Sequence, residues 1–89
     1  MTERYAIRLT KSAEKDLYDL PPKQFKQVVK KIFSLQANPI PQDCKMLQGY
    51  SGSYRVDQGE FRILYSIIEG EVRIFKVGKR NDDEVYRNL

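Results

Sequence analysis

Hydrophobic and polar residues alternate at the start of the chain. Over residues 4–9, Tyr5, Ile7 and Leu9 fall on one side, and the residues between them fall on the other. Alternation with a period of two is typical of a strand that buries one face. The pattern therefore predicts a half-buried strand at 4–9.

A helical pattern follows this strand. Thr10 and Ser12 are candidate N-caps for a short helix that runs through Leu20. Pro21-Pro22 ends that helix and can open a second one, which is predicted to reach about Ala37. Apolar residues recur at helical spacing in both segments: Ala13, Leu17 and Leu20, then Phe25, Val28, Val29, Ile32 and Leu35 or Gln36. The two segments predict an antiparallel helical hairpin.

The second half of the chain indicates a loop and then a meander. Residues 38–52 contain two prolines and two glycines and show little periodicity, which predicts a loop. Alternating runs then predict three strands, at about 53–57, 60–68 and 71–77. Gln58-Gly59 and Glu69-Gly70 are predicted to be two-residue hairpin turns. Residues 81–89 are polar and predict a short helical turn or a tail.

This order of elements predicts an α+β domain. One strand, two helices and three strands favour an antiparallel-core sheet with the helical hairpin packed on one face. At 89 residues the chain is long enough for one domain, predicted to span 1–89.

Alternation divides the predicted meander into two faces. The apolar face, expected to carry the helices, holds Tyr54, Val56, Phe61, Ile63, Tyr65, Ile67, Val72 and Ile74. The opposite face is mixed and holds Arg55, Arg62, Leu64, Ser66, Arg73, Phe75 and Val77. A face with this much apolar surface and charge suits a ligand or a partner chain.

The predicted turn sets the register of the first hairpin. Asp57 should face Glu60, and Arg55 should lie opposite Arg62. Like charges directly across an antiparallel pair are destabilising, so an anion between them is one explanation. The other explanation of the predicted pairing is that both arginines extend into water and that each pairs with Asp57 or Glu60. Arg80 falls on the helix-bearing side unless Gly78 supplies a bulge that changes the alternation.

Composition narrows the classes of function. A net charge of +4 favours an acidic partner such as nucleic acid. The chain contains no histidine and a single cysteine, Cys44, so a disulfide framework, a metal cluster and histidine acid–base chemistry are all excluded. The polar N-terminus and the lack of a long apolar run predict a cytoplasmic protein without a membrane anchor. Arginine forks fit phosphate oxygens, which makes the arginines of the meander candidate ligands of phosphate.

The meander resembles a known family. The segments GEFRILYSI and VRIFKVGKRNDDEVY, with CKMLQG and SYRV upstream, are similar to the RelE family of bacterial toxins from toxin–antitoxin pairs. The resemblance extends over essentially the whole chain. It implies a ribosome-dependent endoribonuclease that cuts mRNA in the decoding site without a cofactor. It also implies a small sheet with two helices on one side and an open basic face, and a cognate antitoxin that blocks the toxin.

The resemblance also implies roles for individual residues. Arg62 matches the strand arginine that contacts the scissile phosphate, and Arg80 matches an arginine that helps the leaving group. Tyr86 matches a tyrosine that orients or stacks on the nucleotide, and Arg55 lies where the family often has a lysine. Further candidates for RNA binding are Lys45, Tyr54 and Lys79. Asp57 replaces a lysine proposed as the general base in some members. Either Asp57 is itself the base, or Arg55 and Tyr86 carry more of the catalysis, or the site is weaker.

Two other functions fit the same sequence. A ParE-like toxin would act by binding DNA gyrase and would not be a nuclease. A non-catalytic nucleic-acid or partner-binding module would depend more on the lysines of the second helix than on Arg80. The Lys23 to Lys31 segment is otherwise expected to be a solvated helix face.

Overall fold

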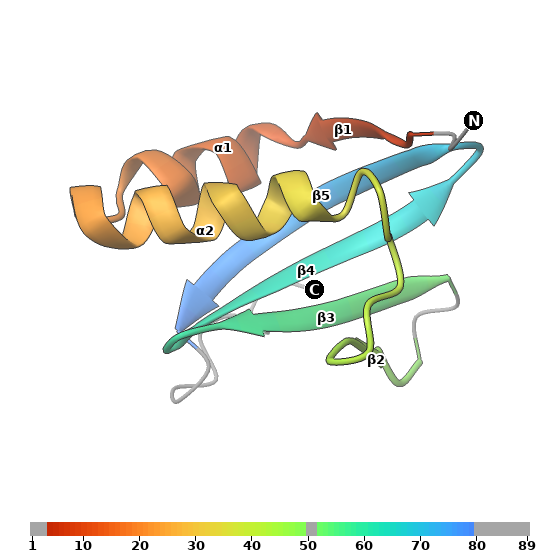
Figure 1. Ribbon diagram of the computed structural model, residues 1–89. Helices are drawn as coiled ribbons and strands as arrows, with labels where there is room; N and C mark the ends of the chain where they lie inside the picture. The colour runs from red at the N-terminus through yellow and green to blue at the C-terminus, as the bar shows by residue number, and fades with distance from the viewer. Residues whose placement is uncertain (1–3, 50–51, 80–89) are drawn as a thin grey trace.

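Two helices lie against one face of a five-stranded mixed sheet (Figure 1). The computed structural model describes residues 4–49 and 52–79. Its elements are β1 (Ala6–Leu9), α1 (Lys11–Tyr18), α2 (Pro22–Ser34), β2 (Lys45–Met46), β3 (Ser53–Gln58), β4 (Phe61–Ile68) and β5 (Glu71–Lys79). The order across the sheet is β1-β5-β4-β3-β2. Only the β1–β5 pair is parallel within the described sheet, and the predicted α+β architecture is confirmed.

The helical hairpin forms where the apolar pattern predicts it. Thr10 is the N-cap of α1, because its Oγ1 accepts a hydrogen bond from the backbone N–H of Ala13 at 3.1 Å. The helix ends at Tyr18, before the predicted Leu20, because a residue that precedes proline avoids helical geometry. The second helix ends at Ser34, before the predicted Ala37, and its last turn tightens there.

The core lies between the helices and the sheet. Residues of the predicted apolar face and of the two helical stripes build most of it: Ala13, Leu17, Val28, Ile32, Leu35, Val56, Phe61, Ile63, Tyr65, Val72 and Ile74. Val77, predicted on the opposite face, joins them. Tyr54 and Ile67 pack at its margin. The prediction of which sheet face carries the helices is therefore confirmed.

The register of the first hairpin differs from the prediction by one residue on each strand. Gln58 pairs with Phe61, so the turn consists of Gly59 and Glu60 rather than Gln58 and Gly59. Gly59 has φ +61°, which suits glycine in the first position of a tight hairpin turn. As a result Asp57 lies opposite Arg62, and the predicted Arg55–Arg62 pairing is wrong.

A β-bulge in β5 changes the face of the residues after it. Tyr65 pairs with Ile74 but Leu64 pairs with Lys76, so Phe75 is the extra residue. Val77 consequently joins the helix-bearing core instead of the opposite face, which corrects the strict alternation. The bulge predicted as possible at Gly78 would lie three residues further on.

Candidate functional site

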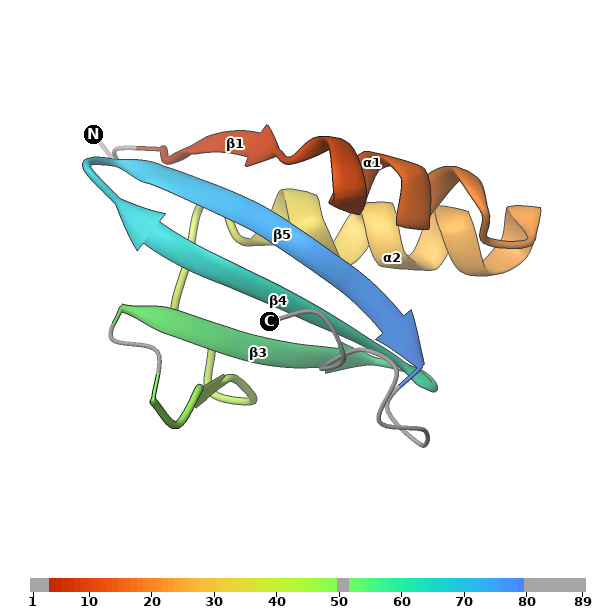
Figure 2. The same ribbon diagram turned by 180° about the vertical axis from the view of Figure 1, so that it is seen from behind.

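The face of the sheet turned away from the helices is called the open face (Figure 2). Its centre is apolar: Leu64 is completely buried and packs with Leu47 and Phe75. Leu47 directly follows β2 and is held by a hydrogen bond from its backbone N–H to the carbonyl of Ser53 at 2.9 Å. The open face is therefore partly covered by the β2 segment, and charged groups lie around an apolar floor.

Strand β2 and Leu47 fall within the stretch that the sequence analysis predicted to be a loop. A two-residue strand is too short to produce a recognisable alternation. The only signal for it was the Lys-x-Leu-x-Gly segment formed by Lys45, Leu47 and Gly49. This short strand adds Lys45 to the edge of the sheet.

Arg62 and Asp57 form a two-point ion pair on the open face. The guanidinium donates from Nε to Asp57 Oδ1 at 2.7 Å and from Nη2 to Oδ2 at 3.3 Å. The side chains retain 17% and 31% of their exposure, so the pair is partly buried. Two parallel hydrogen bonds to a carboxylate fix the plane of an arginine. The pair holds Arg62 in one orientation, opposite Gly78 on β5.

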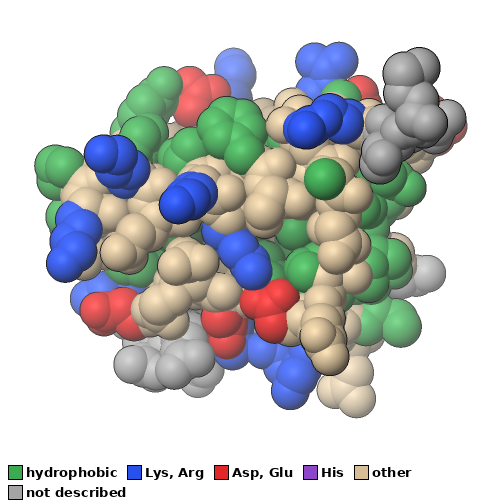
Figure 3. Space-filling model, in the orientation of Figure 1, with side chains coloured by type: hydrophobic (Ala, Val, Ile, Leu, Met, Phe, Trp, Pro, Cys, Tyr) green, Lys and Arg blue, Asp and Glu red, His purple; other side chains and the backbone are tan. Residues whose placement is uncertain are grey.

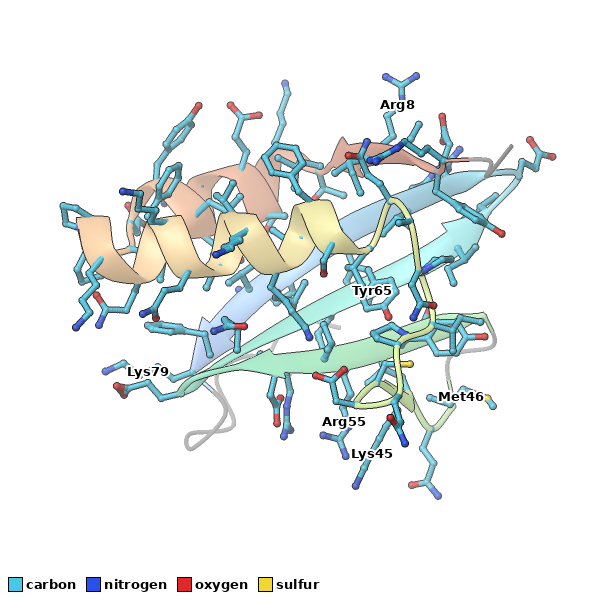
Figure 4. The ribbon with its side chains drawn as sticks, in the orientation of Figure 1. Arg8, Lys45, Met46, Arg55, Tyr65 and Lys79 are labelled. Carbon is cyan, nitrogen blue, oxygen red and sulfur yellow. The ribbon has the colours of Figure 1, made fainter. Side chains whose placement is uncertain are left out.

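Two cations face each other beside this pair. Lys45 lies directly across from Arg55 in the β2–β3 ladder, and both side chains extend in the same direction (Figure 4). Among the residues that the structure describes, no carboxylate lies within ion-pair distance of either. Like charges opposed in this way repel each other. The open face thus carries the like-charge pair that favours an anion, and that pair is Lys45 and Arg55.

Two predicted RNA-binding residues do not share this surface. Tyr54 lies on the helix-bearing side, where its ring stacks on Tyr65 with centroids 5.9 Å apart. Lys79 is exposed at the end of β5 and pairs with Phe61, a residue of the helix-bearing core. Of the predicted residues, the structure brings together Lys45, Arg55 and Arg62. Arg80 and Tyr86 lie outside the described residues.

The helix-bearing side has a different distribution of charge. Lysine and arginine side chains are scattered over it and are separated by apolar and neutral groups (Figure 3). Lys31 is neutralised by Asp43 at 3.0 Å. This pattern is consistent with the solvated helix face that the sequence analysis expected.

Comparison with known proteins places the chain in a family. Residues 7–84 match the family described as the ParE toxin of the type II toxin–antitoxin system parDE. The chain is 34% identical to the toxin RelE1 of Methanocaldococcus jannaschii, with 96% of this chain and 98% of the relative covered. The chain belongs to the RelE/ParE superfamily of type II toxins.

Other relatives of this RelE-family toxin agree in sequence and in fold. Toxin RelG of Mycobacterium tuberculosis is 31% identical, over 93% of this chain and 97% of the relative. The toxin–antitoxin complex RelBE2 of the same organism contains a chain that superimposes with a TM-score of 0.79 at 31% identity, covering 92% of this chain and 98% of that one. Two helices over a five-stranded sheet are thus the fold of a RelE-family toxin. No helix in the described ranges has the length and apolar character needed to cross a bilayer.

Proposed function

We propose that this toxin is a ribosome-dependent endoribonuclease that cleaves mRNA in the decoding site and thereby stops translation. The observation that carries the proposal is the opposed pair Lys45 and Arg55 beside the oriented guanidinium of Arg62 on one face. Among the described residues, Lys45 and Arg55 have no carboxylate within ion-pair distance. Cations placed together in this way suit a phosphodiester backbone. Membership of the RelE family supports the same interpretation.

The proposed chemistry needs a proton acceptor, a proton donor and charge stabilisation at phosphorus. The ribose 2′-OH gives its proton to the acceptor as its oxygen attacks the adjacent phosphorus. The bond from phosphorus to the 5′-oxygen then breaks, and that oxygen takes a proton from the donor. Arg62 and Arg55 stabilise the negative charge that develops on the phosphoryl oxygens. The chain has no histidine, so proton transfer is intrinsically poor. Alignment of the message by the ribosome then supplies much of the rate, which accounts for the dependence on that partner.

The remaining roles follow from the family resemblance. Arg80 assists departure of the 5′-oxygen as an electrostatic donor, because an arginine stays protonated. Tyr86 orients or stacks on a nucleotide base. Lys79, exposed at the end of β5, contacts the RNA strand outside the cut, and Tyr54 is the least well placed of the RNA-binding candidates.

A cleavage assay on programmed ribosomes tests this function. Translating ribosomes are mixed with the parent toxin or with Arg62→Ala, and the 5′ ends of mRNA fragments are mapped by primer extension. Loss of an electrostatic donor should slow cleavage by about 10²- to 10³-fold. Lys30→Ala, on the exposed side of α2, is the matched control and should cut at the parent's rate. Parent-like cleavage by a folded Arg62→Ala toxin would contradict the site.

A cognate antitoxin is the second partner in the proposal. An apolar groove of about 440 Å³ runs between β1, α1 and α2, and its apolar lining is Ile7, Leu9, Leu17, Val29, Ile32 and Phe33. Phe33 is 57% exposed and extends the apolar surface of the groove. The related RelBE2 toxin was solved as a complex with its antitoxin. An amphipathic helix of the antitoxin would bury this groove.

Co-expression tests the antitoxin surface separately. Phe33→Asp should lower capture of the toxin by its tagged cognate antitoxin, with cleavage by the free toxin unchanged. Phe33 lies on the helix-bearing side, away from Arg62, so the two activities can be separated. If Phe33→Asp is captured as well as the parent, the antitoxin does not bind in this groove.

The family that matches residues 7–84 is described as the ParE toxin family. Binding of DNA gyrase, the action of a ParE-like toxin, is therefore the alternative function. A supercoiling assay beside the ribosomal assay separates the two. Inhibition of gyrase without mRNA cleavage would replace the nuclease proposal.

A further inference from the structure

A second cluster of charge lies at the opposite end of the open face. Glu71, the first residue of β5, accepts hydrogen bonds from Arg8 Nε at 3.0 Å and from Arg73 Nε at 2.9 Å. Arg8 lies directly beside Arg73 in the parallel β1–β5 ladder. One carboxylate therefore holds two guanidinium groups next to each other, and the cluster keeps a net charge of about +1 because arginine stays protonated.

Glu71 binds the two arginines in a way that leaves their terminal amino groups available to a ligand. Each guanidinium is bound through Nε alone, and its terminal amino groups donate to no other described residue. The side chains of Arg8 and Arg73 are 68% and 48% exposed. They border a shallow hollow of about 370 Å³, which Leu9, Thr10 and the carboxylate-bearing Glu71 also line. Paired arginine forks at the rim of a hollow suit the oxygens of a phosphate.

This cluster shares its face with the candidate cleavage site. Arg73 lies opposite Ser66, and Ser66 and Arg62 are on the same side of β4. Four residues of strand separate them, which corresponds to about 13 Å along the sheet. An RNA strand on the open face can therefore contact both groups.

We propose that Arg8 and Arg73 form a second phosphate-binding site, which holds an RNA backbone at a distance from the point of cleavage. The site deepens the proposed nuclease function and rests on it for the identity of the ligand. Two sources offer the same phosphodiester chemistry: the message itself and the RNA of the ribosome. A plain ion-pair cluster that only stabilises the sheet is the competing explanation.

Binding measurements with charge-neutralising substitutions test this site. Affinity is measured for a short single-stranded RNA and for vacant ribosomes, each over a series of salt concentrations. Arg8→Gln/Arg73→Gln should weaken binding about 10-fold, and the slope of log affinity against log salt should fall by about 0.7 for each phosphate that the variant no longer binds. Lys26→Gln/Lys30→Gln removes the same charge from the exposed side of α2 and should change binding less.

Glu71→Gln separates a binding site from a structural cluster. Removal of the carboxylate charge leaves both arginines free to bind phosphate, so RNA affinity should rise. A cluster that only stabilises the sheet predicts unchanged or weaker binding.

The two RNA ligands identify the source of the phosphate. If Arg8→Gln/Arg73→Gln loses affinity only for the short RNA, the site binds the message. If it loses affinity only for ribosomes, the site binds ribosomal RNA. Equal binding by the arginine variant and the lysine control on both ligands would overturn the proposal. Failure of the parent to cleave mRNA would instead count against the nuclease function and leave these affinities interpretable.

Discussion

Asp57 binds Arg62 through both carboxylate oxygens, at 2.7 Å and 3.3 Å, across the β3–β4 ladder. This contact bears on a question that the sequence left open, namely whether Asp57 is the general base of the proposed reaction. An aspartate that accepts two hydrogen bonds from an arginine orients that arginine. We infer that Asp57 is a positioning residue, which aims Arg62 at the phosphate.

Asp57→Asn distinguishes the two roles. The amide keeps one acceptor oxygen but cannot bind the guanidinium at two points, so Arg62 loses its fixed plane. A positioning role predicts a fall of about 10-fold in the cleavage rate on programmed ribosomes, with the shape of the pH–rate profile unchanged. Loss of a general base predicts roughly 10²- to 10⁴-fold and disappearance of the acid limb. If Asp57→Asn shows the larger loss of cleavage rate and the altered pH–rate profile, Asp57 is the general base and not a positioning residue.

Tyr65 should make the fold sensitive to alkaline pH. Burial raises the pKa of this phenol, the neighbouring Cys44 and Asp43 add to the shift, and its hydroxyl donates to the Pro39 carbonyl at 2.8 Å. The neutral form is favoured in the folded state, while the unfolded chain ionises near pH 10. The contribution of neutral Tyr65 to the free energy of unfolding is thus fully present below about pH 10. Above that pH it falls by about 1.4 kcal/mol per pH unit, because one proton is involved.

Urea unfolding between pH 8 and pH 11 measures this effect. Tyr65→Phe should lose about 1 kcal/mol at neutral pH through the missing hydrogen bond, and its stability should fall less steeply above pH 10. Tyr18→Phe changes a side chain that is 72% exposed and should follow the parent at every pH. Parallel curves for the parent and Tyr65→Phe would show that Tyr65 does not cause the alkaline loss.

The helices and the core face of the sheet could be predicted from the sequence because their signals are local. The apolar stripe of α2 and the alternation in β4 each repeat over several residues. The hairpin register could not be predicted, because Gln58-Gly59 and Gly59-Glu60 are both acceptable two-residue turns. Pairing of Asp57 with Arg62 is compatible only with the second, and it replaces the repulsion that the first would impose.

The strand face of the candidate arginines could be predicted from the sequence, whereas their contacts could not. Arg62 and Arg55 were assigned to the open face, but Lys45 reaches it through a strand of two residues that gives no periodic signal. Phe75, the extra residue of the bulge, packs against Leu64 and Leu47, which are distant in sequence. Such packing depends on the assembled sheet and leaves no pattern within a single strand.

The turn between β4 and β5 offers a stabilising substitution. Glu69 and Gly70 both have positive φ, +48° and +79°, as a type I′ turn requires. Glutamate is strained there, so Glu69→Asn should raise the free energy of unfolding by about 0.5–1 kcal/mol. Gly70→Ala should lower it by about 1–2 kcal/mol, although no atom obstructs a Cβ at that position.

Chemical denaturation of the three proteins measures both changes. Glu60→Asn is the matched control, because Glu60 also occupies a hairpin turn but lacks a positive φ. It should leave the midpoint of unfolding nearly unchanged. A similar gain from Glu60→Asn would mean that removal of a charge, not relief of backbone strain, stabilises the turn.

Asp16 of α1 caps the half of β5 that β1 does not pair with. Strand β1 ends at Leu9, opposite Ile74, so β5 continues beyond its neighbour. Asp16 Oδ2 accepts a hydrogen bond from the Val77 backbone N–H at 3.1 Å and lies 3.6 Å from Lys76 Nζ. A side chain on a helix thereby satisfies a strand edge that could otherwise pair with another chain.

Loss of this carboxylate should expose the edge. Asp16→Ala leaves the Val77 N–H without its acceptor and should lower the free energy of unfolding by about 1–3 kcal/mol. Asp16→Asn retains an acceptor oxygen and should lose less, which separates the hydrogen bond from the ion pair with Lys76. Asp19→Ala, the same change at the exposed end of the same helix, is the control. Light scattering at rising protein concentration should also detect association of Asp16→Ala through the freed edge; a monomeric variant of parent stability would mean that β5 needs no such cap.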